Sequence, residues 1–182
     1  MDPIEQALQQ ALVVRCQLGD RRALEELFLR HNGPLGYYLR RMLSREEVAD
    51  VQQDVWLAVV RRIGRLRAPA AFVVWLYQVA RSKALDRLAS RRASAVPLED
   101  DEPAPEDPAA GPDPEFSPED AARIHEELAR LSPAHREVLL LRFMEDLSYE
   151  EIAAVTGWSP GTVRSRLHYG KLALRKRLED TR

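Results

Sequence analysis

The spacing of apolar residues along the chain predicts helices. Two sets of apolar positions recur every three or four residues, as on the buried face of a helix: Val48, Val51, Val55, Val59 and Ile63, and Phe72, Trp75, Leu76 and Val79. The alternation typical of a half-buried strand stands out nowhere. We therefore expect an all-α fold, with at least four helices on each side of a central proline-rich segment.

Capping residues mark where several of these helices begin. A serine followed by proline supplies a side-chain cap and a first helical residue whose N–H is not needed. This pair occurs at Ser117-Pro118, Ser132-Pro133 and Ser159-Pro160. Ser148, with Glu151 three residues later, forms a capping box. Breaks between helices are expected at Gly19-Asp20, Gly33-Pro34 and Arg67–Pro69.

Residues 93–117 divide the chain into two parts. The segment holds six of the twelve prolines and almost no large apolar residues. Such a composition cannot bury enough surface to offset the entropy lost on ordering. We predict a flexible acidic linker at 93–117 between two small helical domains, residues 1–92 and 118–182.

The 182-residue chain has a net charge of −2, but its charge is unevenly distributed. Residues 1–92 carry +6, residues 93–120 contain ten acids and no base, and residues 159–178 carry +6 with no acid. Basic regions of this kind are candidates for contact with nucleic-acid phosphates. Solvated Lys and Arg on helix faces would give the same pattern, so charge alone leaves both interpretations open.

Other classes of protein are disfavoured by what the sequence lacks. Its apolar runs fall far short of the ~20 residues of a membrane-spanning helix, and no secretory signal is evident near Met1. A single cysteine excludes an intramolecular disulfide, and the four histidines show no metal-ligand spacing. We expect a cytoplasmic protein without metal or cofactor. The core is expected to include Cys16, Met42, Met144 and Leu139–Leu141, with His31 and His125 at the surface.

Residues 148–177 have the pattern of a helix-turn-helix. A capped helix from Tyr149 to about Val155 precedes a turn at Gly157, and a second helix begins at Pro160. The packing seam is predicted to consist of Ile152, Ala153, Val163 and Leu167. In such a motif the second helix enters the major groove of DNA. Its candidate DNA contacts are Ser159, Thr162, Arg164, Ser165, Arg166, His168, Tyr169 and Lys171. An amphipathic helix with a solvated basic face is the alternative, and the cap, turn and seam together favour the helix-turn-helix.

The N-terminal half carries a polar helical face formed by Asp50, Gln53 and Asp54. Such a face can dock a basic partner, but spacing alone favours ordinary solvated surface. Paired carboxylates also serve in acid–base catalysis. Because no nucleophile or metal-ligand set accompanies them, we do not expect an enzyme.

The helix expected over residues 70–92 combines aromatic residues with a cationic row. Phe72, Trp75 and Tyr77 precede Lys83, Arg87 and Arg91, which are spaced four apart. Aromatic faces beside a basic track are typical of proteins that hold unpaired bases and their backbone. Alternatively, the aromatic residues are core and the cations solvated. For Trp75 the apolar spacing favours the core, whereas the cationic row is the better candidate for phosphate contact.

Taken together, these motifs resemble a bacterial RNA polymerase sigma factor of the small, extracytoplasmic-function type. Residues 50–56 resemble the family's motif for binding core polymerase. Residues 72–76, 80–81 and 85–87 resemble its promoter-melting and minus-ten helix. Residues 131–139, 149–153 and 161–166 resemble its domain for the minus-thirty-five element. The order of these motifs around a linker is more specific than any one of them.

The resemblance implies a role for each site residue. Asp50, Gln53 and Asp54 would bind the coiled coil of the largest polymerase subunit, so that the resemblance reverses the preference for solvated surface. The melted minus-ten strand would be contacted by Phe72, Trp75, Arg81, Ser82, Lys83, Arg87 and Arg91. Arg164, Ser165, Arg166 and His168 would face the upstream element, with Lys171 on its backbone. The chain departs from the family pattern at Ser82, where many members carry Asn, and at Tyr169, where a basic residue is common.

The function that the resemblance implies is promoter-specific initiation of transcription. The partners would be core RNA polymerase, promoter DNA and an anti-sigma factor, with no direct membrane insertion. A stand-alone helix-turn-helix regulator is the alternative, with the N-terminal helices serving dimerisation or ligand binding. A third class is an interaction protein that sequesters a partner. A stand-alone regulator would bind duplex DNA tightly without polymerase.

Overall fold

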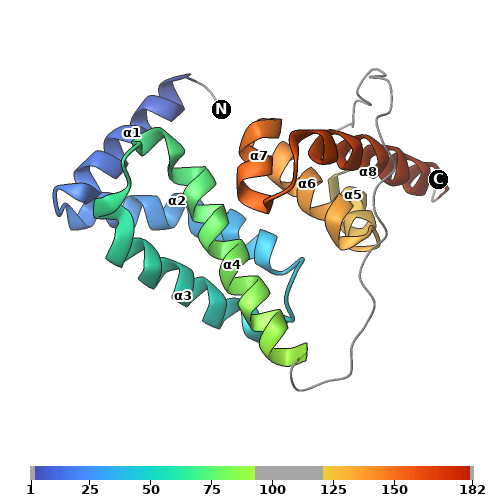
Figure 1. Cartoon of the computed structure of the whole chain (residues 1–182), viewed down its shortest axis with the longest axis horizontal. Coiled ribbons are helices and arrows are strands. Elements are labelled where there is room, and N and C mark those ends of the chain that lie inside the picture. The colour runs from blue at the N-terminus through green and yellow to red at the C-terminus, as the bar shows by residue number, and fades with distance from the viewer. Residues whose placement is uncertain (1–2, 93–120, 181–182) are drawn as a thin grey trace. The chain divides into compact units, whose positions relative to one another are not determined.

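The computed structural model describes residues 3–92 and 121–180, which divide into two compact units (Figure 1). All regular structure in these residues is helical, with four α-helices in each unit. The expected all-α fold of two small helical domains is thereby confirmed. The predicted linker, residues 93–117, and the predicted helix start at Ser117-Pro118 lie outside the described residues.

The N-terminal unit consists of four α-helices and two short 3₁₀ turns. Its elements are α1 (Pro3–Gln17), α2 (Arg21–Leu39), α3 (Arg45–Arg62), η1 (Ile63–Arg65), η2 (Pro69–Ala71) and α4 (Phe72–Arg92). Helix α2 packs against α1 and α3, and α3 in turn packs against α4. The valine stripe predicted for α3 is confirmed, since Val48, Val51, Val55, Val59 and Ile63 are all buried.

Two of the three expected breaks in this unit occur. Gly19 adopts a positive φ of 88°, and the Asp20 carboxylate then caps α2 by accepting from Arg22 N at 2.9 Å. The break expected at residues 67–69 falls between the two 3₁₀ turns, where residues 66–68 are not helical. The break expected at Gly33-Pro34 is wrong, because α2 continues through Pro34. Buried residues before and after that proline, Leu27 and Leu35 among them, lie in one core. Their packing offsets the ~3 kcal/mol that an interior proline costs.

The buried face of α4 differs from its predicted stripe. It consists of Phe72, Val73, Leu76, Tyr77, Ala80 and Ala84. Trp75 and Val79 are only half-buried. Tyr77 packs edge-on against Tyr38 of α2, with ring centroids 5.1 Å apart and planes at 85°. Packing against α3 and α2 therefore buries a face of α4 that differs from the one that apolar spacing favours.

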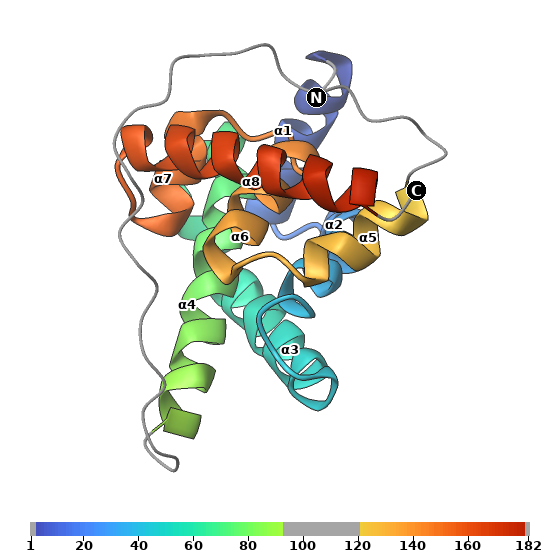
Figure 2. The same cartoon turned by 90° about the vertical axis from the view of Figure 1, so that its right-hand side faces the viewer.

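The C-terminal unit is built around its last helix. It contains α5 (Ala121–Ala129), α6 (Pro133–Phe143), α7 (Tyr149–Thr156) and α8 (Pro160–Asp180). Helix α8 packs against α5, α6 and α7, and Figure 2 shows it lying across α6 and α7. Its Gly170 makes the approach to α6 close, because a Cβ there would lie 3.3 Å from His135 Cβ.

Several single-residue expectations about the core require correction. Leu139–Leu141 are buried as predicted, but Met144 is 44% exposed and Met42 and Cys16 are half-buried. His31 is buried rather than at the surface. It lies on the core face of α2, one helical turn from both Leu27 and Leu35.

No helix in residues 3–92 or 121–180 is long and apolar enough to cross a membrane. The same residues contain no group of three His, Cys, Asp or Glu side chains arranged to hold a metal ion.

Candidate functional sites

Helices α7 and α8 form the predicted helix-turn-helix. Ser148 and Glu151 cap α7 reciprocally: Glu151 N donates to Ser148 Oγ at 3.2 Å, and Ser148 N donates to Glu151 Oε2 at 2.8 Å. The helix ends at Gly157, whose φ of 77° is the left-handed conformation that glycine accepts at little cost. Thr162 N then donates to Ser159 Oγ at 3.1 Å, which caps the start of α8.

The seam between the two helices is apolar. Ile152 and Val163 are fully buried and Leu167 is 1% exposed. Ala153, also predicted for the seam, is only half-buried. With a single left-handed residue in the turn, this seam holds α8 against α7 and leaves the first turns of α8 at the surface.

The predicted DNA contacts of α8 do not all face outward. Ser159 and Arg164 are exposed, and Thr162, His168 and Tyr169 are partly exposed. The expectation that Ser165 and Lys171 face outward is wrong, since both are buried. Ser165 Oγ donates to the Thr162 carbonyl at 3.0 Å.

Lys171 belongs to the buried face of α8. It follows Gly170, which lies close to α6, and it is 7% exposed. Burial lowers the pKa of its ammonium group. This position is less accessible to a DNA backbone than the sequence suggests.

Arg166 stacks on an aromatic ring of the turn. Its guanidinium carbon lies 3.8 Å from the centroid of the Trp158 ring, a cation–π contact. Both side chains are half-buried. Trp158 is a residue that sequence reasoning missed as a contributor to this surface, although it stands directly before the capping Ser159.

In the N-terminal unit, Asp50, Gln53 and Asp54 are all exposed on α3, opposite the buried valines. The three side chains of the predicted polar face are therefore accessible to a partner. The Asp50 side chain is 71% exposed.

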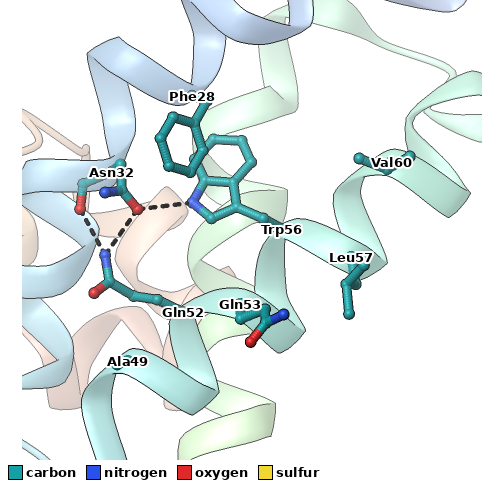
Figure 3. Close-up of a pocket in the computed structure, with 8 residues that line it drawn as sticks. All are labelled: Phe28, Asn32, Ala49, Gln52, Gln53, Trp56, Leu57 and Val60. Atoms are coloured by element: carbon teal, nitrogen blue, oxygen red, sulfur yellow. Dashed lines mark hydrogen bonds between the residues drawn. The ribbon is translucent and has the colours of Figure 1, made fainter.

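A hollow of about 410 Å³ adjoins this face between α2 and α3 (Figure 3). Its lining is largely apolar and consists of Phe28, Asn32, Ala49, Gln52, Gln53, Trp56, Leu57 and Val60. Leu57 and Val60 are 44% and 54% exposed at its edge. The hollow thus places apolar surface beside the acidic face of α3.

A hydrogen-bond network fixes one wall of the hollow. Gln52 Nε2 donates to the Asn32 carbonyl at 2.8 Å and to Asn32 Oδ1 at 2.9 Å, and Trp56 Nε1 donates to the same Oδ1 at 3.1 Å (Figure 3). Gly36 leaves room for Gln52, because a Cβ there would lie 2.8 Å from Gln52 Nε2. Sequence reasoning missed Asn32, which no local pattern connects to residues twenty or more positions later.

Helix α4 presents only some of its predicted contacts at the surface. Phe72 is fully buried, and its ring centroid lies 5.4 Å from that of His31 and 6.2 Å from that of Trp75. Because the protein core covers its ring, Phe72 is not accessible in this conformation to the melted strand that it is predicted to contact. Trp75 is half-buried, which corrects its assignment to the core.

The polar residues of α4 divide between two environments. Ser82 is exposed, and Arg81 and Lys83 are partly exposed. Arg87 and Arg91 are exposed as well, but both form ion pairs with α3.

Comparison with known proteins places the chain in a family. Residues 27–94 match the family model for sigma-70 region 2, and residues 121–174 match that for sigma-70 region 4. The RNA polymerase sigma-H factor of Pseudomonas aeruginosa is 36% identical over 97% of this chain and 96% of its own. The chain belongs to the extracytoplasmic-function family of RNA polymerase sigma factors.

Other sigma factors share most of their length with this one. CarQ of Myxococcus xanthus is 35% identical over 89% of this chain and 92% of its own. The ECF RNA polymerase sigma-E factor of Escherichia coli is 30% identical over 96% of both chains.

Solved structures have the same fold. That of CnrH in complex with the cytosolic domain of CnrY matches with a TM-score of 0.65 and 25% identity, covering 94% of this chain and 97% of CnrH. That of RpoE in complex with the anti-sigma factor NepR from Bartonella quintana has a TM-score of 0.64 at 20% identity, covering 87% of this chain and 98% of that one.

In this sigma factor the two matched regions coincide with the candidate sites. Region 2 includes α3, with its acidic face and hollow, and all of α4. Region 4 includes the helix-turn-helix and the part of α8 that carries Arg164 and Arg166.

Proposed function

We propose that this sigma factor directs core RNA polymerase to specific promoters through separate surfaces on its two units. The proposal rests on one observation above all: an exposed acidic face on α3 and a capped recognition helix, α8, occur in different compact units. In this assignment residues 1–92 bind polymerase and the melted minus-ten strand. Residues 93–117 are a linker, and residues 118–182 read the minus-thirty-five element. The polymerase supplies the chemistry and the sigma factor supplies the specificity.

Recognition of duplex DNA is assigned to the first turns of α8. Arg164 is exposed there, and its guanidinium fork suits the O6 and N7 atoms of guanine. Ser159 and Thr162 lie at the same end of the helix, where hydroxyl groups reach bases or phosphates. Arg166 is also assigned a contact with DNA, and its stacking on Trp158 orients the guanidinium group. His168 and Tyr169 extend the same surface.

Capture of the melted strand is assigned to α4. Trp75 offers a partly exposed ring, and Arg81, Ser82 and Lys83 lie two turns further along the helix. Arg87 and Arg91, both exposed, continue the cationic row that begins at Lys83. Stacking on an aromatic side chain contributes roughly 1–3 kcal/mol per base. This offsets the few kcal/mol that unstacking a base costs.

Binding of core polymerase is assigned to α3. Asp50, Gln53 and Asp54 would contact the coiled coil of the largest subunit, and the adjoining hollow offers apolar surface for a side chain of that coiled coil. An anti-sigma factor is proposed as a further partner, because CnrH, of similar structure, was solved with a protein bound to it.

Run-off transcription with purified core polymerase tests this function. We expect transcripts from a subset of genomic promoters only when the sigma factor is added. Free sigma factor should bind duplex promoter DNA weakly and gain affinity when polymerase is present. A stand-alone regulator would instead bind its duplex site tightly alone and give no transcripts, and that pair of results would refute the proposal.

A further inference from the structure

Glu47 of α3 connects that helix to the cationic row of α4. Its Oε1 lies 3.3 Å from Arg87 Nε and its Oε2 lies 3.3 Å from Arg91 Nη1. Arg87 Nη2 also lies 3.8 Å from Asp50 Oδ2. Two of the three cations in the row that sequence analysis assigned to phosphate contact are therefore paired with acids of the protein itself.

The Glu47 carboxylate is also held by Ser44, at the start of α3. It is the third residue of a capping box, in which Ser44 Oγ donates to Oε2 at 2.7 Å and Ser44 N donates to the same atom at 3.2 Å. The side chain is only 11% exposed. The Ser44 hydroxyl first, and Arg87 and Arg91 in addition, lower the pKa of Glu47, so that it is ionised at neutral pH.

A fixed carboxylate competes with phosphate for the same guanidinium groups. Arg87 and Arg91 are 44% and 58% exposed at their side chains, so a nucleic-acid backbone can reach them. To bind a phosphate, each must share or give up its pairing with Glu47. An exposed, mobile carboxylate would compete less with phosphate, because its side chain would move away from the arginines at little cost.

We propose that Glu47 is a positioning residue that restrains Arg87 and Arg91 and thereby weakens the attraction of α4 for single-stranded DNA. This inference rests on the proposed function, in which the cationic row contacts the melted strand. It goes beyond that function by assigning an opposing role to a residue that does not itself contact DNA.

Glu47→Gln tests the proposal, because glutamine also serves as the third residue of a capping box and so keeps the start of α3. Glu46→Gln is the matched control, since Glu46 is an exposed acid in the same helical turn. The probe is a fluorescein-labelled oligonucleotide of deoxythymidine, and the affinity of the full chain for it is measured by anisotropy at several salt concentrations. Circular dichroism checks that each variant is folded.

Glu47→Gln is expected to bind this probe more tightly and with a steeper salt dependence. Each added phosphate contact on a single strand steepens the slope by ~0.7, so that two arginines add about 1.4. Over a fourfold reduction in salt this amounts to a further factor of about 7 in affinity. Glu46→Gln should show only the small, salt-screened gain that follows from removing one negative charge.

Removing both arginines separates this inference from the function on which it rests. If Arg87→Ala with Arg91→Ala abolishes the gain of Glu47→Gln, the inference holds. If the double variant weakens DNA binding but Glu47→Gln behaves like Glu46→Gln, the role of Glu47 is refuted and the cationic row stands. If the double variant changes binding in neither background, the assigned row itself is wrong.

Should Glu47→Gln fail to fold, Glu47→Asp serves instead, because it keeps the charge but shortens the reach to the arginines. Its affinity for the oligonucleotide should also increase.

Discussion

His31 gives the N-terminal unit a measurable dependence of stability on pH. The imidazole lies in the core of that unit, with its ring centroid 5.4 Å from that of Phe72. Its Nε2 atom is buried and has no hydrogen-bond partner in the part of the chain that the structure describes. Burial, and secondarily the charge of Arg30, lower the pKa of His31 from 6.5 to about 4.

The size and sign of the effect follow from this difference. The unfolded chain binds the proton below pH 6.5, whereas the folded chain resists it until about pH 4. Above pH 6.5 His31 is neutral in both states, and with respect to this group the free energy of unfolding is at its highest. It decreases as the pH falls from 6.5 to about 4. At 1.36 kcal/mol per pKa unit, the loss is on the order of 3 kcal/mol.

His31→Leu removes the titrating group and replaces it with an apolar side chain suited to the site. Between pH 7 and pH 4.5 we expect the free energy of unfolding to fall less in this variant than in the wild type. The difference should be most of the ~3 kcal/mol attributed to protonation of His31. Urea unfolding followed by tryptophan fluorescence measures it. A Trp158→Phe background leaves Trp56 and Trp75, both in the N-terminal unit, as reporters.

Leu27→Met is the control, because Leu27 is fully buried on the same face of α2 and carries no titrating group. This substitution should lower the free energy of unfolding by less than about 1.5 kcal/mol, and by a similar amount at each pH. If His31→Leu follows the wild-type pH dependence, or if NMR titration of the His31 ring finds a pKa near 6.5, the reasoning is wrong.

Three further predictions concern the candidate interfaces. Arg164→Ala should cost ~1–3 kcal/mol of promoter binding and relax specificity at one upstream base pair, whereas an unchanged base preference across a promoter library would exclude direct readout. Asp50→Ala combined with Gln53→Ala should reduce co-purification with core polymerase without changing the circular dichroism spectrum, since both side chains are exposed, and undiminished association would contradict the assigned face. Trp158→Ala should remove a cation–π contact with Arg166 worth about 0.5–2 kcal/mol and lower the melting temperature of the C-terminal unit, with Trp158→Phe intermediate; equal melting temperatures would show that the stacking contributes nothing.

Local features of this sigma factor were predictable because the residues that form them stand within four positions of one another. Ser148 and Glu151 cap α7, and Gly157 ends it. The valines of α3 lie on one face because the helical period alone brings them there. The same local reasoning identified the helix-turn-helix and the exposed acidic face of α3.

Features that depend on neighbouring helices were not predictable. The apolar spacing of α4 is compatible with two adjacent faces, and packing against α3 and α2 decides which one is buried. The turn expected at Pro34 is absent because core packing outweighs the cost of the proline. Lys171 has the local pattern of a surface cation, yet the packing of the C-terminal unit buries it.

The all-α class, the caps at Ser132, Ser148 and Ser159, the division into two units and the family follow from the sequence alone, since each depends on residue type and short spacing. By contrast, the burial of Phe72, the hydrogen bonds of Asn32 with Gln52 and Trp56, and the ion pairs of Glu47 with Arg87 and Arg91 arise from helix packing. These contacts join residues 20 to 44 positions apart. Which side chains meet over such separations depends on how helices pack, and the helical period carries no information about that.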